Sequence, residues 1–123
     1  MQTCFSAAHS LTIRGQAEPV HGHDFRVTVT LAGATLDSDG LLCDFHDVEA
    51  RLGEIVRPFR NADLNATPPF DAINPSAEQI ARHIGDALAS SLGHQIPARV
   101  ESVAVTEATG CRAIYAPSTN TNT

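Results

Sequence analysis

The most constraining feature of the chain is a regular alternation of side-chain character from His23 to Leu31. Apolar or aromatic residues fill every second position after His23, and polar or charged residues fill the positions between them. Successive side chains of a strand point to opposite faces, so the pattern predicts a strand with one buried and one exposed face. Such half-buried strands are typical of antiparallel sheets. The chain is therefore expected to fold around an antiparallel sheet.

Two histidines begin this strand, in the segment Val20-His21-Gly22-His23. They are two residues apart and should share one face, and Gly22 between them would leave room for a metal or a neighbouring backbone. His9 ends residues 3–9, a second alternating segment. If the two segments pair, three imidazoles meet. Three neutral imidazoles with an open fourth position are typical of a catalytic zinc site.

Two helices are predicted in the middle of the chain. Residues 44–58 show apolar side chains at near-helical spacing, and Pro58 should end that helix. Ser76-Ala77-Glu78-Gln79 matches a capping box at the start of a second helix, for which Gly93 is a natural stop. The apolar face of this second helix is predicted to consist of Ile80, Ile84, Leu88 and Leu92.

Two further strands are expected near the end, at 99–106 and 111–116, joined by a hairpin turn at Thr109-Gly110. Residues 10–20 and 60–75 are expected to be connections. The order is strand, strand, helix, helix, strand, strand. This order predicts an α+β fold, a four-stranded antiparallel sheet with both helices on one face.

The length of 123 residues suits one domain, expected over residues 1–116, and residues 117–123 are expected to form a disordered tail. The net charge is −6 and no lysine is present, which argues against a nucleic-acid partner. We find no run long enough to span a membrane and no secretory signal pattern, so a cytoplasmic location is expected. Three cysteines without a paired spacing are expected to be free thiols that fill space in the core: Cys4, Cys43 and Cys111.

Several motifs together resemble one known family more specifically than any of them alone. In chain order these are Phe5-Ser6-Ala7-Ala8-His9, His21-Gly22-His23-Asp24-Phe25, Gly40 to Asp44-Phe45, Leu64-Asn65, Asn74-Pro75-Ser76-Ala77-Glu78-Gln79 and Thr106-Glu107. The chain resembles the 6-pyruvoyltetrahydropterin synthase and 6-carboxytetrahydropterin synthase family from Phe5 to Tyr115. The resemblance implies a tunnelling fold, in which the sheets of three subunits close a barrel and two trimers can stack into a hexamer.

The resemblance also implies a site. Zn²⁺ would bind His9, His21 and His23, and Glu107 would anchor the pterin ring of the substrate. A carboxylate suits that task because it can accept two parallel hydrogen bonds from an amino group and the adjacent N–H. The family acts on 7,8-dihydroneopterin triphosphate, and zinc would acidify the hydroxyl protons of its side chain.

The sequence departs from the family pattern at three positions. Ala17 stands where the family usually has a cysteine, and Arg60 and Asn61 stand where it has an Asp-His pair. Glu18, three residues before His21, resembles a subgroup in which a glutamate replaces the cysteine and the product is 6-hydroxymethyl-7,8-dihydropterin. A carboxylate beside zinc could act as a base there.

Two further residues are candidate proton carriers, Asp63 and His46. We therefore expect a zinc-dependent lyase that acts on a dihydropterin, with Glu18 as catalytic base and a homo-oligomeric assembly. One alternative is the formation of 6-carboxytetrahydropterin, which belongs to a route to deazaguanine (queuosine) precursors. Another is a catalytically silent protein that binds a pterin or zinc.

Overall fold

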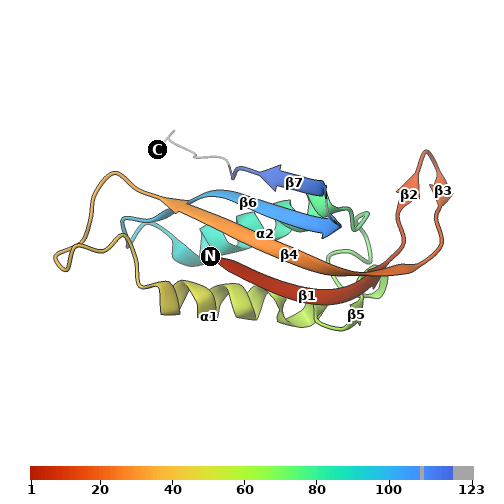
Figure 1. The fold of residues 1–123 in the computed structure, drawn as a ribbon, viewed down its shortest axis with the longest axis horizontal. Helices are drawn as coiled ribbons and strands as arrows, with labels where there is room; N and C mark the ends of the chain where they lie inside the picture. Colours follow the sequence, from red (N-terminus) through yellow and green to blue (C-terminus); the bar gives the residue numbers. More distant parts are fainter. Residues whose placement is uncertain (109, 118–123) are drawn as a thin grey trace.

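The computed structural model describes residues 1–108 and 110–117, and its elements follow the predicted order (Figure 1). The strands are β1 (Gln2–His9), β2 (Thr12–Ile13), β3 (Gln16–Ala17), β4 (His21–Ala32), β5 (Ala62–Asp63), β6 (Arg99–Ala108) and β7 (Cys111–Tyr115). The helices are α1 (Phe45–Val56), α2 (Ala77–Leu92) and the short 3₁₀ turns η1 (Arg57–Phe59) and η2 (Leu64–Ala66).

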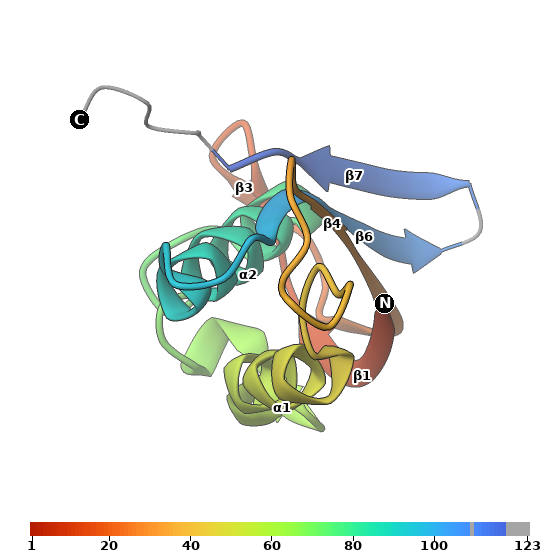
Figure 2. The ribbon, with the colours of Figure 1, turned by 90° about the vertical axis from the view of Figure 1, so that its left-hand side faces the viewer.

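One sheet dominates the fold, with the strand order β5-β1-β4-β6-β7. Its four long strands are antiparallel to their neighbours, which confirms the predicted four-stranded arrangement. The two-residue strand β5 adds a fifth member that runs parallel to β1. Both long helices cover the same face of the sheet, and the other face is open (Figure 2). The predicted α+β fold is therefore confirmed.

The pairing of β1 with β4 positions the histidines. Phe5 lies opposite Phe25 and His9 lies opposite His21 in an unbroken antiparallel register. The rings of Phe5 and Phe25 stack with centroids 5.2 Å apart and are almost completely buried beneath the helices. The apolar face of the predicted strand is therefore the core face of the sheet, and the histidines continue that face toward one end.

Local capping chemistry sets the ends of α1 and α2. The side chain of Asp44 accepts a hydrogen bond from the backbone N–H of His46 at 2.9 Å, and Pro58 lies in the turn that follows α1. The Ser76 hydroxyl accepts from the N–H of Gln79 at 3.1 Å, as the capping-box pattern predicts. α2 ends before Gly93, which has a positive φ of 62°.

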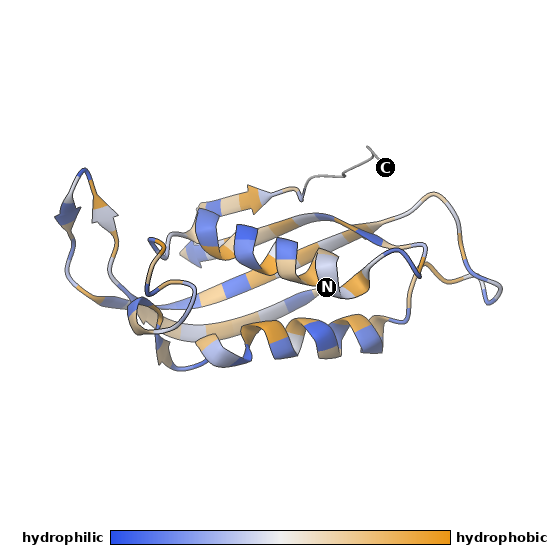
Figure 3. Ribbon diagram, turned by 180° about the vertical axis from the view of Figure 1, so that it is seen from behind, coloured by the Kyte–Doolittle hydropathy of each residue, from blue (hydrophilic) through white to orange (hydrophobic). Residues whose placement is uncertain are grey.

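The four predicted apolar positions of α2 are fully or almost fully buried. Both long helices show hydrophobic and hydrophilic residues alternating along their length, as amphipathic helices on a sheet should (Figure 3).

The segment 10–20 differs from its prediction as a plain loop. It contains β2 and β3, which form a small separate hairpin projecting beyond one end of the main sheet (Figure 1). Arg14 and Gly15 both have positive φ, at 52° and 79°, which is the backbone of a two-residue hairpin turn. An Arg-Gly pair is a weak hairpin pattern because arginine rarely adopts a positive φ.

The C-terminal predictions are only partly covered by the described residues. β6 and β7 pair as expected, but Thr109 of the predicted turn and residues 118–123 of the predicted tail lie outside the described part. All three cysteines are free thiols. Cys43 fills core space as predicted, and burial raises the pKa of its thiol. Core filling is wrong for Cys4 and Cys111, whose side chains are exposed. Among the described residues, no helix is long and apolar enough to cross a membrane.

Candidate metal centre

Three imidazole rings gather at the end of the sheet where β1 stops and β4 begins. The ring centroid of His9 is 4.7 Å from that of His21 and 5.2 Å from that of His23, and the last two are 4.7 Å apart. His9 is fully buried, and the side chains of His21 and His23 are 37% and 23% exposed. The cluster is therefore anchored in the core and open to solutes on one side.

Backbone carbonyls orient two of these rings. Nδ1 of His9 lies 2.8 Å from the carbonyl oxygen of Pro75, and Nδ1 of His21 lies 3.0 Å from that of Pro19. A carbonyl can only accept, so each Nδ1 carries the proton and each neutral ring presents an Nε2 lone pair. Metal-binding histidines are oriented by outer partners in this way. The sequence did not indicate these two carbonyls.

Glu107 joins the histidines from β6. The register of β4 with β6 ends at the pair Arg26–Thr106, so Glu107 is the next residue, close to the start of β4. Its Oε1 atom lies 3.2 Å from Nε2 of His9 and 3.1 Å from Nε2 of His23. One ligand atom from each histidine and from Glu107 lies within 4.8 Å of all the others. The predicted histidine triad thus has a carboxylate directly beside it.

The donor atoms of this cluster fit a divalent cation. Nε2 of His9 and Nε2 of His23 are buried and have no hydrogen-bond partner. A buried polar atom without a partner is costly, and a bound metal ion would satisfy both nitrogens. Imidazole nitrogen with carboxylate oxygen is a donor set that suits zinc.

Glu18 lies at the rim of the cluster. Its Oε1 is 3.7 Å from Nε2 of His21, and the carboxylate is 31% exposed. The backbone of Leu11 holds Glu18 in place: its N–H donates to Oε1 at 3.3 Å and its carbonyl accepts from the Glu18 N–H at 2.8 Å. Ala17, at the family's usual cysteine position, ends β3 and is exposed. The predicted base therefore reaches the histidines, whereas Ala17 offers no reactive group.

Gly22 lies between His21 and His23 at the start of β4. It faces the open side of the sheet, away from the imidazoles, and a Cβ built on it would come no closer than 3.8 Å to its nearest neighbour, the carbonyl oxygen of Ala7. That distance is an ordinary van der Waals contact. The interpretation that Gly22 leaves room for a metal or a neighbouring backbone therefore finds no close contact to support it among the described residues.

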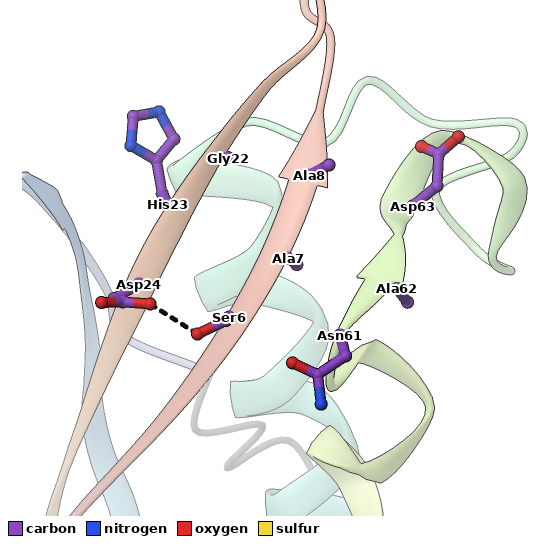
Figure 4. A pocket seen from close by; sticks show the side chains of 9 residues that line it. All are labelled: Ser6, Ala7, Ala8, Gly22, His23, Asp24, Asn61, Ala62 and Asp63. Atoms are coloured by element: carbon purple, nitrogen blue, oxygen red, sulfur yellow. Dashed lines mark hydrogen bonds between the residues drawn. The ribbon is translucent and has the colours of Figure 1, made fainter.

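A cavity of about 600 Å³ lies on the open side, between β1, β4 and β5 (Figure 4). Its lining consists of Ser6, Ala7, Ala8, Gly22, His23, Asp24, Asn61, Ala62 and Asp63. The imidazole of His23 points away from Asn61 and Asp63, and the Ser6 hydroxyl donates to Asp24 (Figure 4). This cavity is therefore adjacent to the metal centre and shares only His23 with it.

The two residues that replace the family's Asp-His pair have structural contacts here. The Arg60 guanidinium donates to the carbonyl of Cys4 at 2.8 Å and to the hydroxyl of Thr3 at 3.3 Å. Asn61 has a positive φ of 55°, which asparagine tolerates, and its N–H donates to the carbonyl of Ser6 at 2.6 Å. Both residues cover backbone groups at the edge of β1, where β5 is too short to do so.

The two other candidate proton carriers lie outside the cluster. Asp63 is in β5, and its carboxylate accepts from the N–H of Asn65 at 3.1 Å, which caps η2. His46 is in the first turn of α1, 95% exposed, and α1 begins at the opposite end of the sheet from the histidine cluster (Figure 1). Their proposed roles stay predictions, and the geometry does not bring either residue to the histidines.

Fold and site together define an α+β protein with a candidate metal centre at one end of its sheet, and the comparisons with known proteins agree with this class. Residues 1–118 match the family described as 6-pyruvoyl tetrahydropterin synthase. An Archaeoglobus fulgidus protein with the provisional name 6-carboxy-5,6,7,8-tetrahydropterin synthase is 34% identical over 89 residues, which are 72% of this chain and 73% of the relative. The chain belongs to the 6-pyruvoyl tetrahydropterin synthase family.

Solved structures share the fold. The Caenorhabditis elegans 6-pyruvoyl tetrahydropterin synthase superposes with a TM-score of 0.82 at 19% identity, over 96% of this chain and 93% of that one. A Plasmodium vivax 6-pyruvoyltetrahydropterin synthase, in which a catalytic glutamate is replaced by alanine, superposes with a TM-score of 0.71 at 17% identity, over 94% of each chain. The predicted tunnelling fold is confirmed by these similarities, which at this identity speak for the fold alone.

Proposed function

We propose that this protein is a zinc-dependent lyase that acts on 7,8-dihydroneopterin triphosphate or a related dihydropterin. The observation that carries the proposal is the convergence of His9, His21 and His23 with two carboxylates, in a chain of a pterin synthase family. Zinc held by the three imidazoles would polarise oxygen atoms of the substrate side chain and make their protons more acidic. The remaining chemistry falls to residues of this chain.

Glu107 would anchor the pterin ring. Its carboxylate is 21% exposed and lies beside the imidazoles, so a ring bound to it would lie next to the metal centre. Two parallel hydrogen bonds from the amino group and the adjacent N–H of the ring would fix the orientation as well as the position. Positioning of this kind supplies a large part of the rate enhancement in many enzymes.

Glu18 would accept a proton from the substrate side chain. It is the second carboxylate at the cluster and is exposed enough to contact a solute. The Leu11 backbone fixes it, because the Leu11 N–H donates to its Oε1 and its own N–H donates to the Leu11 carbonyl. The Plasmodium vivax relative also has a glutamate as a catalytic residue. Because Asp63 and His46 lie outside the cluster, Glu18 is the residue best placed for the base, and the expected product is 6-hydroxymethyl-7,8-dihydropterin.

A second candidate function is favoured by the name of the Archaeoglobus relative, the formation of 6-carboxytetrahydropterin. One experiment separates the two. The zinc-loaded protein is incubated with 7,8-dihydroneopterin triphosphate and the product is identified by mass spectrometry. A hydroxymethyl product supports the first function and a carboxy product the second. No turnover would reject both and leave a pterin-binding homologue.

The proposal includes a homo-oligomer, either a trimer or a pair of stacked trimers, in the cytoplasm. Two features support self-assembly. β7 is an edge strand without a further partner among the described residues, and the sheet face opposite the helices is uncovered (Figure 2). The mass of the protein in solution tests this, since a particle of 13.0 kDa would contradict it.

A further inference from the structure

We propose that Glu107 is a fourth ligand of the metal in the substrate-free protein, and that a bound pterin ring takes this carboxylate away from the metal. The inference rests on the proposed function, because it assumes the metal on the three histidines and the anchoring role of Glu107. It adds a competition between the metal and the ring for one carboxylate. The metal centre would then be closed at rest and would open only when a pterin binds.

The distances at Glu107 match a tetrahedral site. Metal–ligand bonds of 2.0–2.1 Å in a regular tetrahedron place neighbouring ligand atoms about 3.3–3.4 Å apart. Oε1 of Glu107 lies 3.2 Å from Nε2 of His9 and 3.1 Å from Nε2 of His23. Both values are within about 0.3 Å of such an edge. Oε1 of Glu107 would therefore be a fourth ligand of an ion held by the three histidines.

Direct hydrogen bonds do not explain these contacts. His9 donates its Nδ1 proton to the carbonyl of Pro75, so its Nε2 presents a lone pair to the Glu107 oxygen. In this tautomer, two lone pairs at 3.2 Å repel each other unless a proton or a metal ion lies between them. Neither Nε2 of His9 nor Nε2 of His23 has a hydrogen-bond partner. A metal ion bound to all three atoms removes this conflict.

Glu107 is also placed to leave the metal. The register of β6 with β7 shifts between Thr106 and Ala108, so Glu107 lies at a break in the strand ladder, where side chains are commonly redirected. It also lines a cavity of about 430 Å³ with Arg26 and Thr106. A ring in that cavity would therefore lie against the Glu107 carboxylate.

The competition has a consequence that can be measured without catalysis. If one ligand weakens the binding of another, the second weakens the first by the same factor. 6-Methylpterin carries the ring but no side-chain hydroxyl groups with which to bind the metal in exchange. Its binding should therefore lower the zinc affinity of the protein. A complete substrate would compensate by supplying its own oxygen atoms.

The experiment measures the zinc affinity of the full chain by competition with a chromophoric chelator, with and without saturating 6-methylpterin. We expect 6-methylpterin to lower the zinc affinity of the wild type by about tenfold or more. Glu107→Gln should show a comparable loss without 6-methylpterin. Removing even an outer partner of a metal ligand typically costs about 10- to 100-fold in metal affinity, so the loss of a direct ligand should cost at least as much. 6-Methylpterin should not lower the affinity of the variant further. Glu107→Asp, which keeps the charge but shortens the side chain, should behave like Glu107→Gln.

The matched control is Glu18→Gln, which removes the same charge from beside His21. It should lose much less zinc affinity than Glu107→Gln and should keep the wild-type response to 6-methylpterin. Equal losses in the Glu18 and Glu107 variants would show a general charge effect and overturn the proposal. An unchanged zinc affinity in Glu107→Gln would also overturn the proposal that Glu107 binds the metal. If that variant nevertheless lost 6-methylpterin binding, Glu107 would be a pterin anchor only. A wild type that binds no zinc would overturn the proposed function itself.

Discussion

His9 and His83 both lie against aromatic rings in this protein, and only His9 belongs to a candidate site. His9 packs edge-on against Phe25, with centroids 5.3 Å apart. His83 of α2 packs edge-on against Phe59 and Phe70, with centroids 5.6 and 5.7 Å apart. The immediate packing of the two imidazoles is therefore similar. Their surroundings beyond the rings are not.

The two histidines differ in how many metal-ligand side chains meet at their ring nitrogens. Nε2 of His9 meets two further imidazoles and the carboxylate of Glu107, whereas His83 belongs to no group of three or more metal-ligand side chains in the described part of the chain. Partial burial lowers the pKa of His83, which favours the neutral ring. A histidine packed against aromatic rings is thus not in itself evidence of a site. Several lone pairs directed at one point are.

The largest expected effect is the loss of zinc when one histidine of the cluster is removed. His21→Ala removes one of three imidazole ligands, and we expect zinc to fall from near one per chain to almost none after dialysis. The measurement is elemental analysis of the dialysed protein. His83→Ala is the matched change, since His83 is also partly exposed, and it should retain its zinc. Equal zinc loss in the two variants would show that convergence does not define the site.

The next effect concerns the rate rather than the metal. Glu18→Gln should lower kcat by about 10²- to 10⁴-fold, the usual contribution of a positioned base, while zinc content stays at the wild-type level. Glu49→Gln on the exposed surface of α1 makes the same change far from the cluster and should leave kcat unaltered. If Glu18→Gln turned over at the wild-type rate, the assignment of the base would be wrong.

The sequence predicts the histidine cluster well because strand periodicity is a local property. Phe5 and His9 share a face, as do His23 and Phe25, and both pairs follow from alternation alone. The antiparallel pairing of the two segments then places His9 opposite His21. The capped helix from Ser76 is equally local, because its hydroxyl contacts an N–H only three residues away.

The partners of the cluster could not be predicted in the same way, because they depend on which distant segments meet. Pro75 orients His9 across 66 positions of sequence. Glu107 reaches the site only because β6 pairs with β4. The alternation of residues along either strand does not predict which strands are neighbours in the sheet. The resemblance supplied Glu107 as a pterin anchor. Its position beside the imidazoles came from the structure.

A smaller effect is expected at the start of α2, which connects the surroundings of His83 with those of His9. α2 carries His83, and the carbonyl that orients His9 belongs to Pro75, just before the Ser76 cap. Ser76→Ala should lower the free energy of unfolding by about 1 kcal/mol, a typical cost of losing an N-cap, as measured by chemical denaturation. Ser76→Asp keeps a capping oxygen and should stay near the wild type. A Ser76→Ala protein as stable as the wild type would show that the cap does not hold this junction.

The smallest effect concerns His83 itself. Its pKa is lowered in the folded protein, chiefly by burial, although Asp86 opposes that shift, so the unfolded chain binds a proton more readily. Stability from the neutral ring is therefore fully present above the unfolded pKa of about 6.5 and declines as the pH falls below it. His83→Phe keeps a ring between Phe59 and Phe70 but cannot titrate. The drop in melting temperature from pH 7.5 to pH 5.5 should thus be smaller in His83→Phe than in the wild type. All other groups are the same in both proteins, so their contribution cancels in that difference. An equal drop in both would mean that the ring between Phe59 and Phe70 does not resist protonation.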